Sequence, residues 1–117
     1  MKYLIHSEID ENSIILIEFE DGRKEPYFVK QKEVGSITGA TMLLGFKLVD
    51  LLENSKIPYP VSDVWTDRLY ISNEKVKGKH VGIKGYRKLN PEEKTEWTVK
   101  LQRSERLKPL LEVISKN

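Results

Sequence analysis

The stretch SIILIEFEDGRKEPYFVKQKEV, residues 13–34, predicts the hairpin from which the fold is built. Its two ends, SIILIEFE and PYFVKQKEV, are rich in the β-branched and aromatic residues that favour strands. Asp21 and Gly22 between them are the pair that favours a tight hairpin turn. The preceding segment KYLIHSEI, residues 2–9, has the same composition and is separated from SIILIEFE by Asp10-Glu11-Asn12. The beginning of the chain therefore predicts three antiparallel strands.

The segment that follows Gly35, SITGATMLLGFKLVDLLENS (residues 36–55), predicts a helix. Its leucines at 44, 48, 51 and 52 recur at helical spacing, and Ser36 or Thr38 is a suitable N-cap. Gly45 would cost about 1 kcal/mol inside a helix unless a neighbouring element packs closely there. The prolines of IPYP, residues 57–60, favour extended backbone and end the helix.

The second half predicts the same order of elements. Strands are expected in DRLYISNEKV (67–76), KHVGIKGYRKL (79–89) and EWTVKLQ (96–102), with LNPEEKTE (89–96) as a hairpin loop. SERLKPLLEVISK (104–116) predicts a closing helix, with Pro109 in its first turn and an apolar stripe of Leu107, Leu110, Leu111 and Ile114. We therefore predict an α+β fold, a curved antiparallel sheet of two β-β-β-α repeats with the helices packed on one face. The repeats would be residues 1–57 and 67–117, joined by a proline-containing linker at 58–66.

Composition limits the classes of protein that fit. A chain of 117 residues corresponds to one domain, or to two half-domains with a shared core. The absence of cysteine excludes disulfides, thiolate zinc sites and cysteine nucleophiles, and no cofactor is expected. The beginning MKYLIHSEIDENS has acids where a signal peptide needs an apolar run, and the apolar-rich segment 42–52 is too short to span a bilayer. An intracellular, cytoplasmic protein that does not enter a membrane is expected.

Charge is distributed unevenly along the chain. Residues 1–60 contain 7 Lys and Arg against 10 Asp and Glu, and residues 61–117 contain 13 against 8. Within KVKGKHVGIKGYRK, residues 75–88, there are six basic side chains and no acid. This asymmetry predicts a face that meets a polyanion or an acidic protein, although lysines also coat ordinary solvent-facing strands.

Strand alternation divides residues 80–89 into two faces. One face would hold Val81, Ile83, Gly85, Arg87 and Leu89, and the other His80, Gly82, Lys84, Tyr86 and Lys88. Lysines that neutralise phosphates beside a ring that stacks on a base are what single-strand binding requires. Tyr86, with Tyr70 as a second candidate, would be that ring; packing across strands is an equally good interpretation of Tyr86. The candidate nucleic-acid-binding residues are Lys75, Lys77, Lys79, His80, Lys84, Tyr86, Arg87, Lys88 and Lys100.

Residues 67–115 resemble the single-stranded-DNA-binding domain of the transcriptional positive cofactor 4 family. The resemblance is carried by YIS before Lys77-Gly78-Lys79, by Val81, Ile83 and Tyr86 at the family's spacing, and by WTVKLQRSERLKPLLEVIS at the end. It implies a role in transcription and a homodimer or pseudo-dimer that presents a curved basic ridge to unpaired DNA. The ridge would be lined by Lys77, Lys79, Lys84 and Tyr86. Arg87 departs from the family's usual tryptophan, and Asn73 stands at a normally apolar position. Two β-α repeats are also similar to the Whirly and Pur-alpha proteins.

The sequence leaves two classes of function open. His6 and His80 are the only histidines, and no nucleophile or metal motif accompanies them, so an enzyme is not expected. The prediction is a non-catalytic protein that binds single-stranded DNA or RNA with little sequence specificity. The alternative is a protein-binding inhibitor of the immunity or antitoxin type, such as a phage-encoded one, that blocks a nucleic-acid-handling enzyme. In that case the basic segment, or the acids of the first half, would dock the partner.

Overall fold

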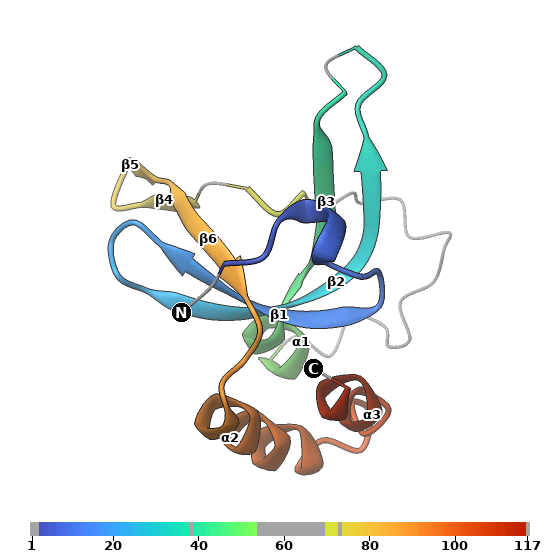
Figure 1. Cartoon of the computed structure of the whole chain (residues 1–117). Helices are drawn as coiled ribbons and strands as arrows, with labels where there is room; N and C mark the ends of the chain where they lie inside the picture. The colour runs from blue at the N-terminus through green and yellow to red at the C-terminus, as the bar shows by residue number, and fades with distance from the viewer. Residues whose placement is uncertain (1–2, 38, 54–69, 73, 117) are drawn as a thin grey trace.

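The computed structural model describes residues 3–37, 39–53, 70–72 and 74–116. Its main sheet is antiparallel and four-stranded, in the order β3-β2-β1-β6, and a separate two-stranded ribbon pairs β4 with β5 (Figure 1). The strands are β1 (Ser13–Phe19), β2 (Lys24–Val34), β3 (Thr41–Lys47), β4 (Glu74–Val76), β5 (Lys79–Val81) and β6 (Ile83–Arg87). The helices are α1 (Leu48–Glu53), α2 (Pro91–Gln102) and α3 (Leu110–Ser115), with a 3-10 turn η1 (His6–Glu8) near the beginning. The predicted α+β class with an antiparallel sheet is confirmed.

The central strand β1 is buried on both of its faces. Ile14 and Leu16 point to a core formed with the three helices, whereas Ile15, Ile17 and Phe19 point to a core on the opposite face. Both cores are possible because β1 has four apolar residues in succession, a pattern typical of strands covered on two sides. The helices do lie on one face of the sheet, but the other face is not the open basic surface that the sequence predicted.

The core on the helix side contains the apolar stripe predicted for the closing helix. Leu107, Leu110 and Ile114 are fully buried there, together with Leu48 and Leu51 of α1. α3 begins at Leu110, immediately after Pro109, so the proline lies at the boundary of the helix and removes no internal hydrogen bond.

The core on the opposite face is covered by three short pieces of chain. Ile9 and Leu4 come from the N-terminal segment, Ile71 precedes the ribbon, and Val81 belongs to β5. The N-terminal segment 2–9 is not the predicted strand: within its described part only Leu4 pairs, through its amide to the carbonyl oxygen of Tyr86 at 2.6 Å. The polar HSE sequence turns into η1 instead.

Residues 41–47 form β3 and not the first half of a helix. β3 pairs with β2 from Tyr27 opposite Lys47 to Val34 opposite Thr41. Hydrogen bonds to a partner strand therefore replace the hydrogen bonds that the backbone would have made within a helix. Helical spacing correctly marks only the segment that becomes α1, residues 48–53. Tertiary pairing therefore overrides a helical pattern in a segment whose residues are apolar enough for either structure.

Residues 91–102 form α2, where the sequence predicted a hairpin loop and a strand. The helix begins with a capping box: the side chain of Asn90 accepts a hydrogen bond from the Glu93 amide, and Glu93 accepts one from the Asn90 amide. Pro91 occupies the first turn, where its missing N–H costs nothing. Trp97 and Leu101, one helical turn apart, bury the inner face. These start signals are present in the sequence, but NPEE also has the composition of a turn.

Strands from both predicted repeats contribute to the main sheet, because β6 pairs with β1. Three strands followed by a helix occur twice in the element order, but β4 and β5 stand apart as a ribbon. The relation between the halves stays a prediction, and the linker 58–66 lies outside the described residues. No helix in the described ranges is long and apolar enough to cross a membrane.

Gly45 tests the contact between β3 and β2. A methyl group on Gly45 would lie 1.9 Å from the carbonyl oxygen of Phe28, beside an irregularity in the strand register. We expect Gly45→Ala to lower the free energy of unfolding by about 3 kcal/mol, since the contacted atom is backbone and cannot move aside. The control is Gly39→Ala, which meets open space and should cost only ~1 kcal/mol for its positive φ. Equal losses in urea titrations of the two variants would contradict this account of β3.

Candidate nucleic-acid interface

The basic segment 75–88 forms the β4–β5 ribbon and continues into β6. Val76 pairs with Lys79 across a two-residue turn in which Lys77 and Gly78 both have positive φ (51° and 80°). Positive φ at both central positions is the pattern of a type I′ turn, which favours glycine at the second of them. The turn places Lys77 at the tip of the ribbon. Lys75 shares a face with His80, and Lys79 lies on the opposite face of the ribbon, so the alternating spacing of Lys75, Lys77 and Lys79 does not place these three lysines on one face.

Except for Arg87, the basic side chains of this segment are exposed. We call Lys75, Lys77, Lys79, His80, Lys84 and Lys88 the ribbon cations; all six are exposed. Within the described part of the chain none of the six has a side-chain ion pair or hydrogen bond. The carboxylate of Glu20 lies against Gly82 at the base of the ribbon. The tip and the outer face of the ribbon therefore present positive charge to solvent.

A bulge in β6 moves Tyr86 away from the lysines. Gly85 lies opposite Glu18 and Ile83 lies opposite Phe19, so Lys84 has no partner in β1. The extra residue reverses the alternation: Tyr86 faces the same way as Ile83 and packs against the core opposite the helices. Burial raises the pKa of the half-buried Tyr86, and its ring lies 5.4 Å from that of His6. The structure favours the packing interpretation of Tyr86 over a stacking platform.

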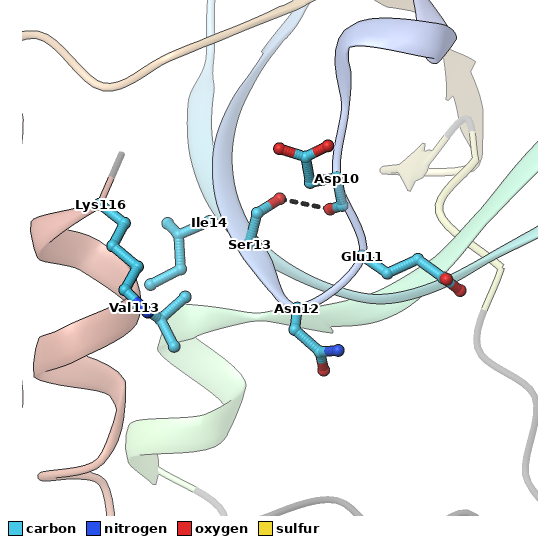
Figure 2. A pocket seen from close by; sticks show the side chains of 7 residues that line it. All are labelled: Asp10, Glu11, Asn12, Ser13, Ile14, Val113 and Lys116. Atoms are coloured by element: carbon cyan, nitrogen blue, oxygen red, sulfur yellow. Dashed lines mark hydrogen bonds between the residues drawn. The ribbon is translucent and has the colours of Figure 1, made fainter.

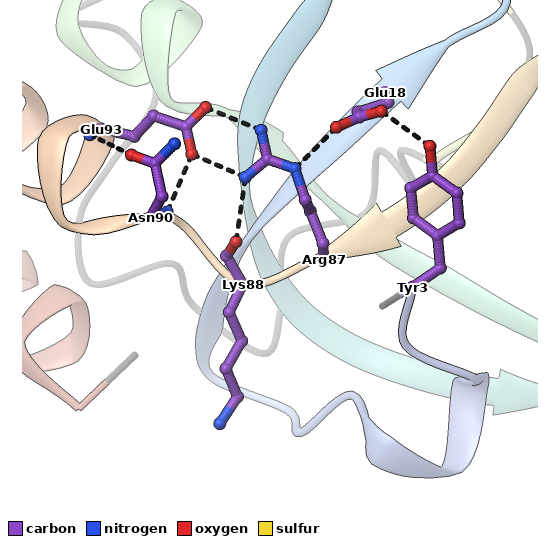
Figure 3. A network of polar contacts seen from close by, with 6 residues as sticks. All are labelled: Tyr3, Glu18, Arg87, Lys88, Asn90 and Glu93. Carbon is purple, nitrogen blue, oxygen red and sulfur yellow. Dashed lines mark hydrogen bonds and ion pairs between the residues drawn. The ribbon is translucent and has the colours of Figure 1, made fainter. Parts of the chain in front are cut away.

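Arg87 is a correction to the predicted site, because only 1% of its surface is exposed. Its Nε donates to Glu18 at 2.6 Å, and Nη1 and Nη2 donate to the two carboxylate oxygens of Glu93 at 2.6 and 2.8 Å (Figure 3). Nη1 also donates to the carbonyl oxygen of Lys88. With its donors engaged, Arg87 joins β6 to β1 and α2 and does not reach a ligand.

The Arg87 network includes the beginning of the chain. The hydroxyl of Tyr3 donates to the second oxygen of Glu18 at 2.7 Å, and the Tyr3 ring covers Gly85, where a Cβ would clash with it (Figure 3). Hydrogen bonds from Arg87, and for Glu18 also from Tyr3, lower the pKa values of Glu93 and Glu18. Hydrogen bonding to Glu93 also raises the pKa of Arg87, so all three groups stay charged at neutral pH.

Lys100 lies on α2, which covers the helix side of the sheet, and not on a strand beside the ribbon. Its Nζ is 3.2 Å from Glu96 and 4.4 Å from the centre of the Trp97 ring. Both contacts are made within its own helix. Lys100 is therefore not one of the residues that the ribbon brings together.

The ribbon is attached to the sheet by Glu74, a residue that the sequence analysis did not single out. Its carboxylate accepts hydrogen bonds from Arg23 Nη1 and the Tyr27 hydroxyl, both at 2.8 Å, and pairs with Lys47 Nζ at 2.5 Å. Burial opposes the charge of Glu74, but these bonds together lower its pKa. Burial, and then the bond to Glu74, raises the pKa of Tyr27. Glu74 is the acid inside a lysine-rich ribbon, and that contrast was the available signal in the sequence.

A pocket between the start of β1 and α3 has the opposite electrostatic character. It is lined by Asp10, Glu11, Asn12, Ser13, Ile14, Val113 and Lys116 (Figure 2). Ser13 Oγ donates to the carbonyl oxygen of Asp10, and Glu11 accepts from the Lys32 amide. Asp10 and Glu11 in its lining make this pocket unsuitable for phosphate. Among the described residues, no group of three or more His, Asp and Glu side chains is arranged to hold a metal ion.

Comparison with known proteins identifies no similar protein. No family model, no curated protein and no solved structure matches the chain. The resemblance to the positive cofactor 4 family therefore stays a prediction, and the strand expected from it at residues 97–102 is part of α2.

Removal of the Arg87 side chain should destabilise the fold. Arg87→Met leaves Glu18 and Glu93 without their partner, and breaking a buried ion pair in this way typically costs about 3 kcal/mol or more. Because folding lowers the pKa values of both acids, their contribution is present above about pH 4.3 and is lost as the pH falls through the folded-state values. Wild-type stability should fall on acidification in urea titrations between pH 5 and 2. Arg87→Met should lose less over that range; an equally steep slope in both proteins would contradict the pairing.

Glu74→Gln should loosen the ribbon and leave the main sheet intact. An amide still accepts from Tyr27, but it loses the charge that attracts Arg23 and Lys47. Amide hydrogen exchange in β4 and β5 should accelerate while exchange in β1 and β2 stays unchanged. Asp21→Asn is the matched control. Asp21 also pairs with Arg23, at 2.7 Å, but it is not part of the cluster around the Glu74 carboxylate. Equal acceleration in the control, or no acceleration in Glu74→Gln, would show that Glu74 does not hold the ribbon.

Proposed function

We propose that the protein binds single-stranded nucleic acid without catalysis, through the exposed ribbon cations. The observation that carries the proposal is that four of these side chains, Lys75, Lys77, Lys79 and His80, share one protruding hairpin, and Lys84 and Lys88 follow on β6 and directly after it. None of the six has a carboxylate partner in the described structure. Lysines in such a position gain by contact with phosphates, because binding releases counterions from the nucleic acid. Arg87 and Lys100 are left out of the proposed site because other groups of the protein already engage them.

The shape of the ribbon agrees with low sequence specificity. Lysine is a flexible point charge that contacts phosphate in many geometries, and phosphate contacts carry no sequence information directly. A flexible single strand can follow the narrow ribbon, and its unpaired bases stay accessible to exposed rings. His80, which shares the outer face with Lys75, supplies an exposed ring that can pack on an unpaired base.

Replacement of two lysines at the tip should change affinity in a way that depends on salt. The change is Lys77→Gln together with Lys79→Gln, and the measurement is fluorescence anisotropy with labelled single-stranded and duplex DNA over a range of salt concentrations. For single strands, each lost phosphate contact reduces the slope of log affinity against log salt by about 0.7, so the double variant should be shallower by about 1.4. Wild-type protein should prefer the single strand.

The control is Lys100→Gln with Lys108→Gln, which removes the same number of charges on the helix side of the sheet. It should leave the affinity nearly unchanged. An equal loss in the control would show that general charge, and not the ribbon, attracts the DNA. If wild-type protein bound no DNA at low salt, the proposal would be wrong, and the ribbon would have to be tested as a docking surface for an acidic protein.

A further inference from the structure

The hairpin of β2 and β3 extends beyond the rest of the sheet as a two-stranded arm. β1 pairs with β2 only as far as Val29, opposite Ser13, whereas β2 and β3 continue to pair up to Val34 and Thr41. Residues 31–37 and 39–42 therefore project past the central strand, and Figure 1 shows both the arm (top right) and the β4–β5 ribbon (left) away from the helices at the bottom of the view. The end of the arm is closed by a hydrogen bond from the Gly35 amide to the carbonyl oxygen of Ala40.

The tip of this arm exposes apolar side chains and carries no charge. Ile37 is 97% exposed and Val34 is 70% exposed. Met42, which is 38% exposed, pairs with Glu33 and therefore faces the opposite side of the arm from Val34. The sequence from Val34 to Met42, VGSITGATM, has no ionisable side chain. The acid next to it in sequence, Glu33, accepts a hydrogen bond from the Tyr70 hydroxyl at 3.1 Å. A nearly fully exposed isoleucine at the end of an uncharged arm gains free energy from any apolar surface that covers it.

The size and charge of the arm tip indicate what kind of ligand would cover it. A standard protein–protein interface uses about 20–30 residues on each side, far more than the two exposed apolar side chains Val34 and Ile37 on a narrow arm. The face of one or two unpaired bases is a closer match in area. Apolar side chains such as isoleucine and methionine are also those that proteins insert between base steps. The uncharged tip does not repel phosphate, and two lysines, Lys30 and Lys32, lie on the adjoining part of β2.

We infer that the arm tip, through Ile37 and Val34, packs against the bases of the strand whose phosphates contact the ribbon. This inference rests on the proposed function and adds a second contact surface of different chemistry to it. The ribbon cations would supply the salt-dependent attraction. The arm would supply a salt-independent preference for strands that carry bases, and this role replaces the stacking predicted for Tyr86.

The experiment compares two probes with the same phosphate backbone, a labelled thymine single strand and a labelled abasic single strand of equal length. Wild-type protein should bind the thymine strand on the order of 5- to 10-fold more tightly, the gain expected from packing one base. Val34→Ser with Ile37→Ser should reduce this preference to what the His80 ring supplies, and leave the affinity for the abasic strand unchanged. Val99→Ser, the same kind of change at an exposed position of α2, is the matched control and should behave like wild type.

Each of the other possible outcomes contradicts the inference, the proposed function, or both. If wild-type protein binds both probes equally, the arm does not contact bases, although binding through the ribbon stands. If it binds neither probe, the proposed function and this inference are both wrong. If the double variant converts a dimer to a monomer in sedimentation without DNA, the tip is a contact between two copies of the chain. Circular dichroism and the unfolding midpoint show whether the variant is folded; should it unfold, Ile37→Ser alone is measured with the same probes.

Discussion

The structure depends on the burial of β1 on both faces. Ile14 and Leu16 face the helices while Ile15 and Ile17 face the other core, so β1 needs cover above and below and a pairing strand at each edge. β2 supplies one edge through the tight turn at Asp21-Gly22, and β6 supplies the other from more than sixty residues away. The chain cannot complete the sheet with its first half alone, since the second edge of β1 belongs to the second half.

Two groups of charged side chains have different roles in the fold. Arg87 and Glu74 are nearly enclosed, and each is surrounded by opposite charges that hold one element against another. The ribbon cations have no such partners in the described structure and stay in solvent. A buried charge that is already paired cannot be reached by a ligand, and loss of its partner destabilises the protein, whereas an unpaired surface charge is available to a ligand. This division, and not the number of lysines, defines the surface proposed to contact nucleic acid.

The sequence correctly located the basic segment, but it predicted the same role for all its basic side chains, although Arg87 is buried and the others are exposed. Exposure of the six ribbon cations follows from strand composition and the Gly78 turn, both of which are local. Arg87 was grouped with them because one arginine in a basic run has the same composition as its neighbours. Its role depends on Glu18 and Glu93, which strand pairing and helix packing bring to it. The exposed arm tip was missed because the same residues, 36–42, fit the start of a helix.

The sequence by itself determined the α+β class, the β1–β2 hairpin, the apolar stripe of the closing helix and the position of the basic segment. Each depends on contacts between residues close in the chain, or on a periodicity that local backbone geometry fixes. Only the tertiary structure decided that residues 41–47 pair with β2 and that a bulge at Lys84 turns Tyr86 toward a core. A strand requires a partner, and one extra residue reverses every side chain after it. Both depend on which distant segment lies alongside, and no local pattern specifies that.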